Sequence, residues 1–252
     1  KIWRKFEVGN LFQLLMLDTR SIYRDKQLKI EDYLDGNTIN KSKYKRDLSL
    51  DRKLIGLEQI LWIKNNLNKK FKWSIIGQQV LMAKVYLPSI FANMNKMILP
   101  DYLHKYLKIG GANVPYNTDA WDGYPKERER LFRELKKANS VLVLTGDTHN
   151  SWLNNLYDEN NNFIGIEIGT PAISSPNTID TFGSLTDGIE EGFIKENNDV
   201  KWTEGKHKGY TLLKLTKDKS VITFVYVDTV KSKAYKVIET NKFNVKPNTP
   251  II

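Results

Sequence analysis

One stretch decides the fold of this chain: Val141-Leu142-Val143-Leu144-Thr145-Gly146-Asp147-Thr148-His149-Asn150. Residues 141–144 carry no polar side chain, which predicts a central strand that is buried on both faces. Gly146 permits a sharp turn off this strand, and polar groups follow the turn. In an open α/β sheet, ligands collect at the carboxyl ends of the strands. We therefore expect residues 145–150 to border a functional site.

Two further strands are expected, and each ends in polar residues. Residues 12–17 form a short apolar run that ends at Asp18-Thr19-Arg20, and residues 73–77 form another that ends at Gln78-Gln79. Apolar residues at helical spacing predict a helix over 56–67, between the two strands. Strand, helix and strand in this order imply parallel crossover units of an α/β protein. Parallel strands would bring all three polar ends to one edge of the sheet.

The remaining sequence is consistent with a single domain over residues 1–252, because no linker composition divides it. Pro125 opens a further helix at its first turn, where the missing N–H costs nothing. Residues 210–215 and 221–227 are expected to form an antiparallel hairpin. Two polar or glycine- and proline-containing stretches are expected to be irregular: 26–53 and 87–122.

Composition excludes several classes of protein. A chain of 252 residues with 40% hydrophobic content can bury a sizeable core. Its longest apolar runs have about four residues, far fewer than the ~20 that a membrane span needs. The absence of cysteine excludes disulfides, thiolate metal sites and cysteine nucleophiles. The net charge of +10 attracts anions, but the lysines are scattered and form no stripe with aromatic residues, so we expect no specific nucleic-acid binding.

Asp147 and His149 are the candidate metal ligands. They lie two positions apart in a turn, so both can address one cation or two neighbouring cations. Carboxylate and imidazole suit ions such as Fe, Mn or Zn, and Asn150 adds a neutral oxygen. The alternative is a structural turn in which these side chains bond to nearby loop backbone.

Arg20 and Gln78 are candidate substrate-binding residues at the other two strand ends. The planar guanidinium of Arg20 suits a phosphate group. Its alternative is an internal salt bridge with Asp18 or Asp25. Gln78 is a candidate neutral ligand or donor to substrate, and the alternative of a satisfied loop amide is slightly favoured.

Several short motifs follow one another along the chain. They are Leu17-Asp18-Thr19-Arg20, Gly77-Gln78-Gln79-Val80, Asp119-Ala120-Trp121-Asp122-Gly123-Tyr124-Pro125, Leu144-Thr145-Gly146-Asp147-Thr148-His149, Gly169-Thr170-Pro171, Ser174-Ser175-Pro176, Gly209-Tyr210 and Tyr226-Val227-Asp228-Thr229-Val230. In order and approximate spacing they resemble the PhoD-like alkaline phosphatases. The resemblance runs from Ile2 to about Thr240, and several motifs in order are far more specific than a lone glycine-aspartate-x-histidine.

The resemblance implies a calcineurin-like metallophosphoesterase fold, in which a two-sheet β sandwich is flanked by helices. It also implies hydrolysis of phosphomonoesters or phosphodiesters, with iron and calcium as cofactors and manganese or zinc as alternatives. Two metals would activate a water for in-line attack on the phosphate. The roles carried over are Asp147, His149 and Asp122 for metal binding, His149 and Arg20 for catalysis, and Arg20, Gln78 and Asn150 for substrate binding. The alternative for Asp122 is a purely structural role, because Trp121 and Tyr124 beside it are expected to pack in the core.

The sequence also departs from the family. Three earlier motifs of the family are not found: an aspartate-containing first strand, a second metal aspartate and a tryptophan-aspartate-aspartate-histidine-glutamate stretch. The remaining histidines, His104 and His207, do not lie in any of these motifs. We therefore expect the N-terminal part of the fold to be missing and the chain to be its C-terminal portion. A separate N-terminal half or partner chain would supply the remaining ligands, and this chain alone would have weak or no activity.

Two alternatives and two further expectations remain from the sequence. The chain is either part of a working phosphatase or a degenerate, non-catalytic relative that binds a ligand or partner. Missing strands would leave an exposed sheet edge, which favours a partner or an oligomer. No signal peptide is visible in residues 1–12, so the sequence leaves the compartment open, although the resemblance implies export to the periplasm or beyond.

Overall fold

The computed structural model describes residues 2–252, and its centre is a seven-stranded sheet in the order β1-β2-β5-β6-β8-β7-β9. These strands are β1 (Arg4–Val8), β2 (Phe12–Met16), β5 (Trp73–Gly77), β6 (Val141–Thr145), β7 (Ser151–Tyr157), β8 (Phe163–Gly169) and β9 (Val200–Glu204). The four neighbours β2, β5, β6 and β8 are parallel, whereas β1 and β7 run antiparallel to the strands beside them. The apolar strand β6 lies fourth of seven, in the central place that its sequence predicts.

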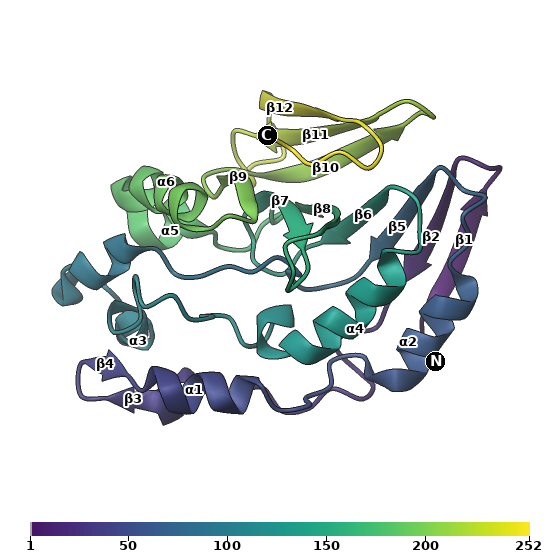
Figure 1. Ribbon diagram of the computed structural model, residues 1–252. Coiled ribbons are helices and arrows are strands. Elements are labelled where there is room, and N and C mark those ends of the chain that lie inside the picture. Colours follow the sequence, from purple (N-terminus) through teal and green to yellow (C-terminus); the bar gives the residue numbers. More distant parts are fainter. Residues whose placement is uncertain (1) are drawn as a thin grey trace.

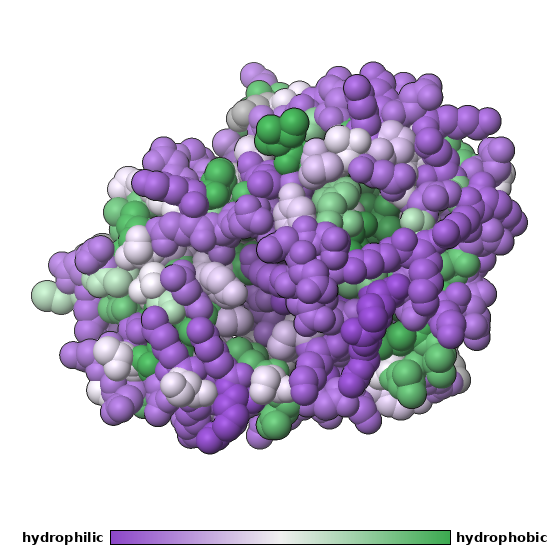
Figure 2. Space-filling model, viewed as in Figure 1, coloured by the Kyte–Doolittle hydropathy of each residue, from purple (hydrophilic) through white to green (hydrophobic). Residues whose placement is uncertain are grey.

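A three-stranded antiparallel sheet covers one face of the large sheet (Figure 1). It consists of β10 (Lys208–Leu215), β11 (Ser220–Val227) and β12 (Val237–Val245). Trp73 and Ile166 of the large sheet share a buried apolar cluster with Phe224 of the small one. The surface is mainly hydrophilic in this view, with hydrophobic side chains gathered beneath the three-stranded sheet (Figure 2).

Helices α1 (Lys41–Leu48), α2 (Gly56–Asn66) and α4 (Pro125–Leu135) lie on the opposite face (Figure 1). Helix α4 begins at Pro125 and buries Leu131, Phe132 and Leu135 in the larger apolar core. The other elements are α3 (His104–Leu107), α5 (Thr178–Phe182), α6 (Thr186–Glu196), the strand pair β3 (Leu34–Asp35) and β4 (Thr38–Ile39), and 3-10 helices η1 (Ile30–Tyr33), η2 (Ser89–Asn93), η3 (Lys96–Ile98), η4 (Asp101–Leu103), η5 (Trp121–Gly123) and η6 (Gly183–Leu185). Across residues 2–252, no helix is long and apolar enough to cross a membrane.

The structure confirms a mixed α/β chain and most of the expected elements. The expected strands are β2, β5 and β6, the expected helices are α2 and α4, and the hairpin is β10 with β11. Parallel pairing brings the carboxyl ends of the three strands to one edge, as predicted.

The prediction of irregular chain over residues 26–53 is wrong in part, because this segment contains helix α1. The Asn40 side chain caps this helix by accepting a hydrogen bond from the N–H of Lys43 at 3.0 Å. Tyr44 and Leu48, four positions apart, are buried although most of their neighbours are charged. A narrow apolar stripe of two residues is too weak a periodic signal to predict a helix from sequence.

Candidate functional site

A cavity of about 670 Å³ lies at the shared strand edge, between the two sheets. Its apolar walls come from the strands, and most of its polar walls come from the loops that follow them. The apolar part is Leu14, Met16, Leu144, Ile168 and Leu213, and the polar part includes Arg20, Gln78, Gln79, Asp147, Thr170 and Thr211. Two of the three candidate strand ends thus supply a predicted substrate-binding residue to this cavity, and the third supplies a predicted metal ligand.

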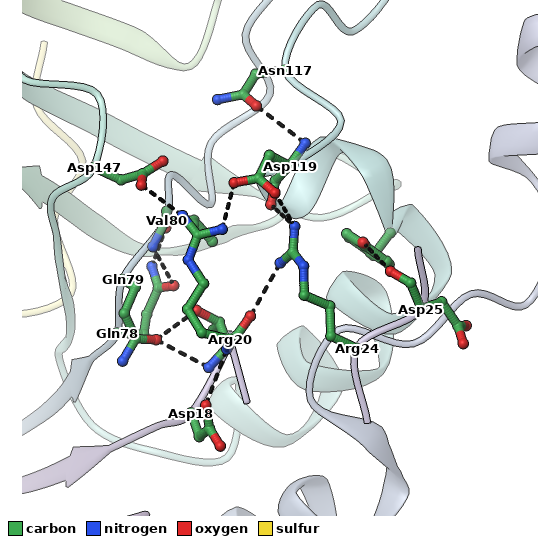
Figure 3. Close-up of polar contacts among 12 residues, drawn as sticks. Asp18, Arg20, Arg24, Asp25, Gln78, Gln79, Val80, Asn117, Asp119 and Asp147 are labelled. Atoms are coloured by element: carbon green, nitrogen blue, oxygen red, sulfur yellow. Dashed lines mark hydrogen bonds and ion pairs between the residues drawn. The ribbon is translucent and has the colours of Figure 1, made fainter. Parts of the chain in front are cut away.

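Arg20 stands between two carboxylates at the cavity (Figure 3). Its Nη2 lies 2.6 Å from Oδ1 of Asp147, and its Nη1 lies 2.5 Å from Oδ2 of Asp119. Partial burial disfavours the charge, but the two carboxylates outweigh it and raise the pKa of the guanidinium. The alternative of an internal salt bridge is thus present in the structure, but its partners are Asp119 and Asp147, and the expected partners Asp18 and Asp25 are wrong. Asp18 accepts hydrogen bonds from the N–H groups of residues 20 and 21, and Asp25 accepts one from the N–H of residue 53.

Two residues that the sequence did not single out complete this arrangement. Arg24 donates from Nη2 to the carboxylate of Asp119 and, at 2.8 Å, to its backbone carbonyl. Asp119 therefore joins Arg20 to Arg24. The only sequence signal for Asp119 is its place at the start of the 119–125 motif, and Arg24 has no signal beyond lying four residues after Arg20.

Asp147 and His149 follow β6 in an unusual backbone conformation. Their φ angles are 72° and 67°, in the left-handed region that few non-glycine residues adopt. Such residues cluster at functional sites, where the surrounding structure sustains the strain. The Nδ1 of His149 lies 2.6 Å from the carbonyl oxygen of Pro176. Since a carbonyl can only accept, this contact assigns the proton to Nδ1 and leaves Nε2 for another ligand, as is usual for metal-binding histidine.

Asp147 and His149 therefore have the chemistry of one end of a metal centre. They provide only two donors, however. Within the part of the chain that the structure describes, no group of three or more His, Cys, Asp or Glu residues could hold a metal ion. A complete site would need ligands in addition to these two.

The structure places Asp122 away from this pair. Its carboxylate is buried, with Oδ1 at 2.6 Å from Nη1 of Arg128 and Oδ2 at 2.9 Å from the N–H of Val85. Both oxygens are thus occupied by protein donors, and the neighbouring Trp121 and Tyr124 are fully buried. This environment supports the structural alternative for Asp122 over a role as a metal ligand.

Gln78 and Asn150 also have protein partners. Gln78 lines the cavity, but its Oε1 accepts from the N–H of Val80 at 3.1 Å and from Nε1 of Trp121 at 3.2 Å. Asn150 donates to Oγ1 of Thr178 at 2.7 Å and borders a small apolar pocket beside that residue. Both amides therefore fix loops of the site, and only Gln78 faces the same cavity as Arg20 and Asp147.

A loop beyond β5, which has no clear pattern in the sequence, supports the strand end that carries Gln78. We call residues 80–86 the strap. The strap has almost no secondary structure of its own, and buried side chains accept hydrogen bonds from its backbone N–H groups. The acceptors are Glu167 for Met82 and Ala83, Asp199 for Lys84, Asp122 for Val85, and Asn197 for Tyr86. Burial raises the pKa of Glu167 to about 7 and that of Asp199 to about 6.

Fold and site together define a mixed α/β protein with its functional groups at the carboxyl edge of a largely parallel sheet. A family described as PhoD-like phosphatase matches residues 1–224. The chain is 32% identical over 225 residues to alkaline phosphatase D from Bacillus subtilis (strain 168), covering 86% of this chain and 32% of that protein. A solved structure described as "Structure of PhoD" matches with a TM-score of 0.68 and 27% identity, over 98% of this chain and 42% of that one.

The chain belongs to the PhoD-like phosphatase family, as its motifs predicted. It spans about a third of the curated relative and less than half of the solved chain.

Proposed function

We propose that this chain contributes the arginine and one end of the metal centre to the active site of a phosphoric ester hydrolase. The observation that carries the proposal is the contact of 2.6 Å between Arg20 and Asp147 at the cavity, with His149 two residues further on. A guanidinium binds the oxygens of a phosphate, and carboxylate with imidazole binds a metal ion. The likeness to an alkaline phosphatase supports the same reaction class.

Asp147 and His149 would hold the metal, for which the family resemblance favours iron and calcium over manganese or zinc. A bound metal supplies charge stabilisation for the phosphate and a more acidic water. Arg20 would hold the phosphate oxygens in place while charge develops on them. His149, oriented by the Pro176 carbonyl, offers Nε2 either as a ligand or for proton exchange with the leaving oxygen, and it cannot do both at once. The layering of two sheets with helices on one face supports the proposed calcineurin-like sandwich (Figure 1).

The proposal includes completion of the metal centre by groups outside residues 1–252, in a further segment or a partner chain. It is supported by the two-donor set and by the share of the relatives that this chain spans. The edge strand β1 offers one place for such a polypeptide to join the sheet, since it pairs only with β2 in the described part of the chain. Phe6 and Val8 on this strand are each 49% exposed.

The test is hydrolysis of p-nitrophenyl phosphate and bis-p-nitrophenyl phosphate with manganese, iron or calcium added. We expect weak or no turnover by the chain alone and restored turnover when a polypeptide with the missing family motifs is added. Arg20→Gln should lower the restored kcat/KM by about 100-fold, as loss of a transition-state donor does. Arg130→Gln, which alters a half-buried arginine of α4 that also pairs with a carboxylate, is the matched control. Robust turnover by the chain alone would refute the divided site.

A second candidate is a non-catalytic module that binds an anionic ligand or a partner. It is favoured by the pairing of Asp147 with Arg20, which already neutralises the carboxylate without a metal. This candidate predicts that the reconstituted protein binds inorganic phosphate but shows no metal-dependent turnover with either ester.

A further inference from the structure

We propose that Asp119 and Arg24 are positioning residues, which hold the guanidinium of Arg20 at the cavity so that it meets a phosphate group in a fixed orientation. The inference rests on the proposed function for the identity of the ligand. The arrangement itself is seen in Figure 3 as a row of alternating charges, Asp147, Arg20, Asp119 and Arg24.

Arg24 is the fixed end of this row. Its Nη1 donates to the carbonyl of Thr19 at 3.0 Å, and its Nη2 donates to the backbone and side chain of Asp119. Its guanidinium also lies 5.3 Å from the ring centroid of Tyr124, a fully buried residue. The side chain is only 14% exposed, so Arg24 has little freedom to reach a ligand and acts through Asp119.

Asp119 links the ordered side chain of Arg24 to the side chain of Arg20. Its own N–H donates to Oδ1 of Asn117 at 3.1 Å, and its two carboxylate oxygens are shared between Arg24 and Arg20. Arg20 is 36% exposed and would otherwise lose rotamer freedom on binding phosphate. A side chain that is already ordered loses less rotamer freedom on binding. We call Asp119 and Arg24 the clamp, and we expect it to increase the affinity of Arg20 for phosphate without contacting the ligand.

A competing explanation is that Asp119 merely occupies the place of the anion. Both explanations place a carboxylate against Arg20, but they predict opposite effects of its removal. Loss of a positioning residue weakens binding of phosphate, whereas loss of a competing anion strengthens it.

The first measurement follows the Arg20 guanidinium by 15N NMR, with its signals assigned from an Arg20→Lys variant. We expect rotation about the Nε–Cζ bond to become about 2- to 10-fold faster in Asp119→Asn and in Arg24→Gln, as for loss of one hydrogen bond to a charged group. Asp51→Asn is the matched control, because Asp51 pairs with Arg130 at the same 2.5 Å on another surface. Unchanged Arg20 signals in both clamp variants would overturn the proposal, whatever the ligand of the site is.

The second measurement is titration of the protein with inorganic phosphate by calorimetry. Both clamp variants should raise the Kd by about 3- to 10-fold, while Asp51→Asn leaves the Kd unchanged. Tighter binding in Asp119→Asn would overturn the proposal in favour of a competing anion. If the unaltered protein binds no phosphate, the proposed role of Arg20 in phosphate binding is refuted. The NMR measurement still tests whether Asp119 and Arg24 hold the Arg20 side chain in place. Thermal unfolding of each variant confirms that it is folded before either comparison is made.

Discussion

Carboxylates occupy two contrasting regions of this molecule, the buried strap and the exposed strand edge. At the strap, Glu167 and Asp122 are buried, and rigid backbone N–H groups donate to their oxygens. At the strand edge, Asp119 and Asp147 are about a third exposed, and both form ion pairs with the side chain of Arg20, which is itself 36% exposed. Side chains also reach both buried acids, since Arg128 donates to Asp122 and Asn154 donates to Glu167. Burial together with backbone donors therefore distinguishes the acids beside the strap from the partly exposed acids at the strand edge.

The largest expected effect comes from breaking the buried pair of the strap region. Asp122→Asn would leave Arg128 as an uncompensated buried charge, which should lower the free energy of unfolding by about 3 kcal/mol. Urea denaturation measures this change. In Asp51→Asn, which breaks an exposed pair, the loss should stay below about 1 kcal/mol. Equal losses of unfolding free energy in the two variants would contradict the contrast between buried and exposed carboxylates.

The pH dependence of stability is the next test of the buried region. The pKa of Glu167 is about 7 in the folded protein, above the ordinary value of 4.5, because burial disfavours its charge. Between these pH values the folded state binds a proton that the unfolded state has released, so stability should fall as the pH rises from about 5 to 7. We expect Glu167→Gln to flatten this fall by on the order of 2 kcal/mol. An identical pH profile in the variant would show that Glu167 does not titrate in this range.

The smallest effect on stability, and a clear effect on binding, is expected at the strand edge. Asp147→Asn should change the free energy of unfolding by less than about 1 kcal/mol, because its ion pair is partly exposed. In the reconstituted protein, with the polypeptide that carries the missing family motifs added, it should weaken Mn²⁺ binding about 10-fold or more, as measured by calorimetry. Asp51→Asn, which breaks an exposed ion pair with Arg130 on another surface, is the control and should leave Mn²⁺ affinity unchanged. Retained affinity in Asp147→Asn would exclude this carboxylate as a ligand.

Much of the fold near the site could be predicted from sequence, because its signals are local. The apolar run of β6, the proline at the start of α4 and the polar residues after β2 and β5 each act within a few positions. The same holds for the turn with Asp147 and His149, which the structure shows as two residues of positive φ.

The partners of Arg20 could not be predicted, because ion pairs depend on side chains that are remote in sequence. Asp119 is 99 residues from Arg20, and Asp147 is 127 residues from it, whereas the expected partners Asp18 and Asp25 lie within a few residues of it. Both Asp18 and Asp25 instead accept hydrogen bonds from backbone N–H groups. For Asp122, the motif context could not show that Arg128 and Val85 would occupy both oxygens.

The strap has a consequence for how the protein folds. Its hydrogen bonds join residues far apart in sequence, with Lys84 and its acceptor Asp199 separated by 115 positions. Contacts of such long range carry a large loop-closure entropy and slow folding. The full set of hydrogen bonds that holds the loop beyond β5 cannot form before Asp199, which directly precedes β9, has been synthesised. A nascent chain ending before Asp199 would contain Arg20, Asp147 and His149, and the strap acceptors Asp122 and Glu167, but it would lack the acceptor for the N–H of Lys84.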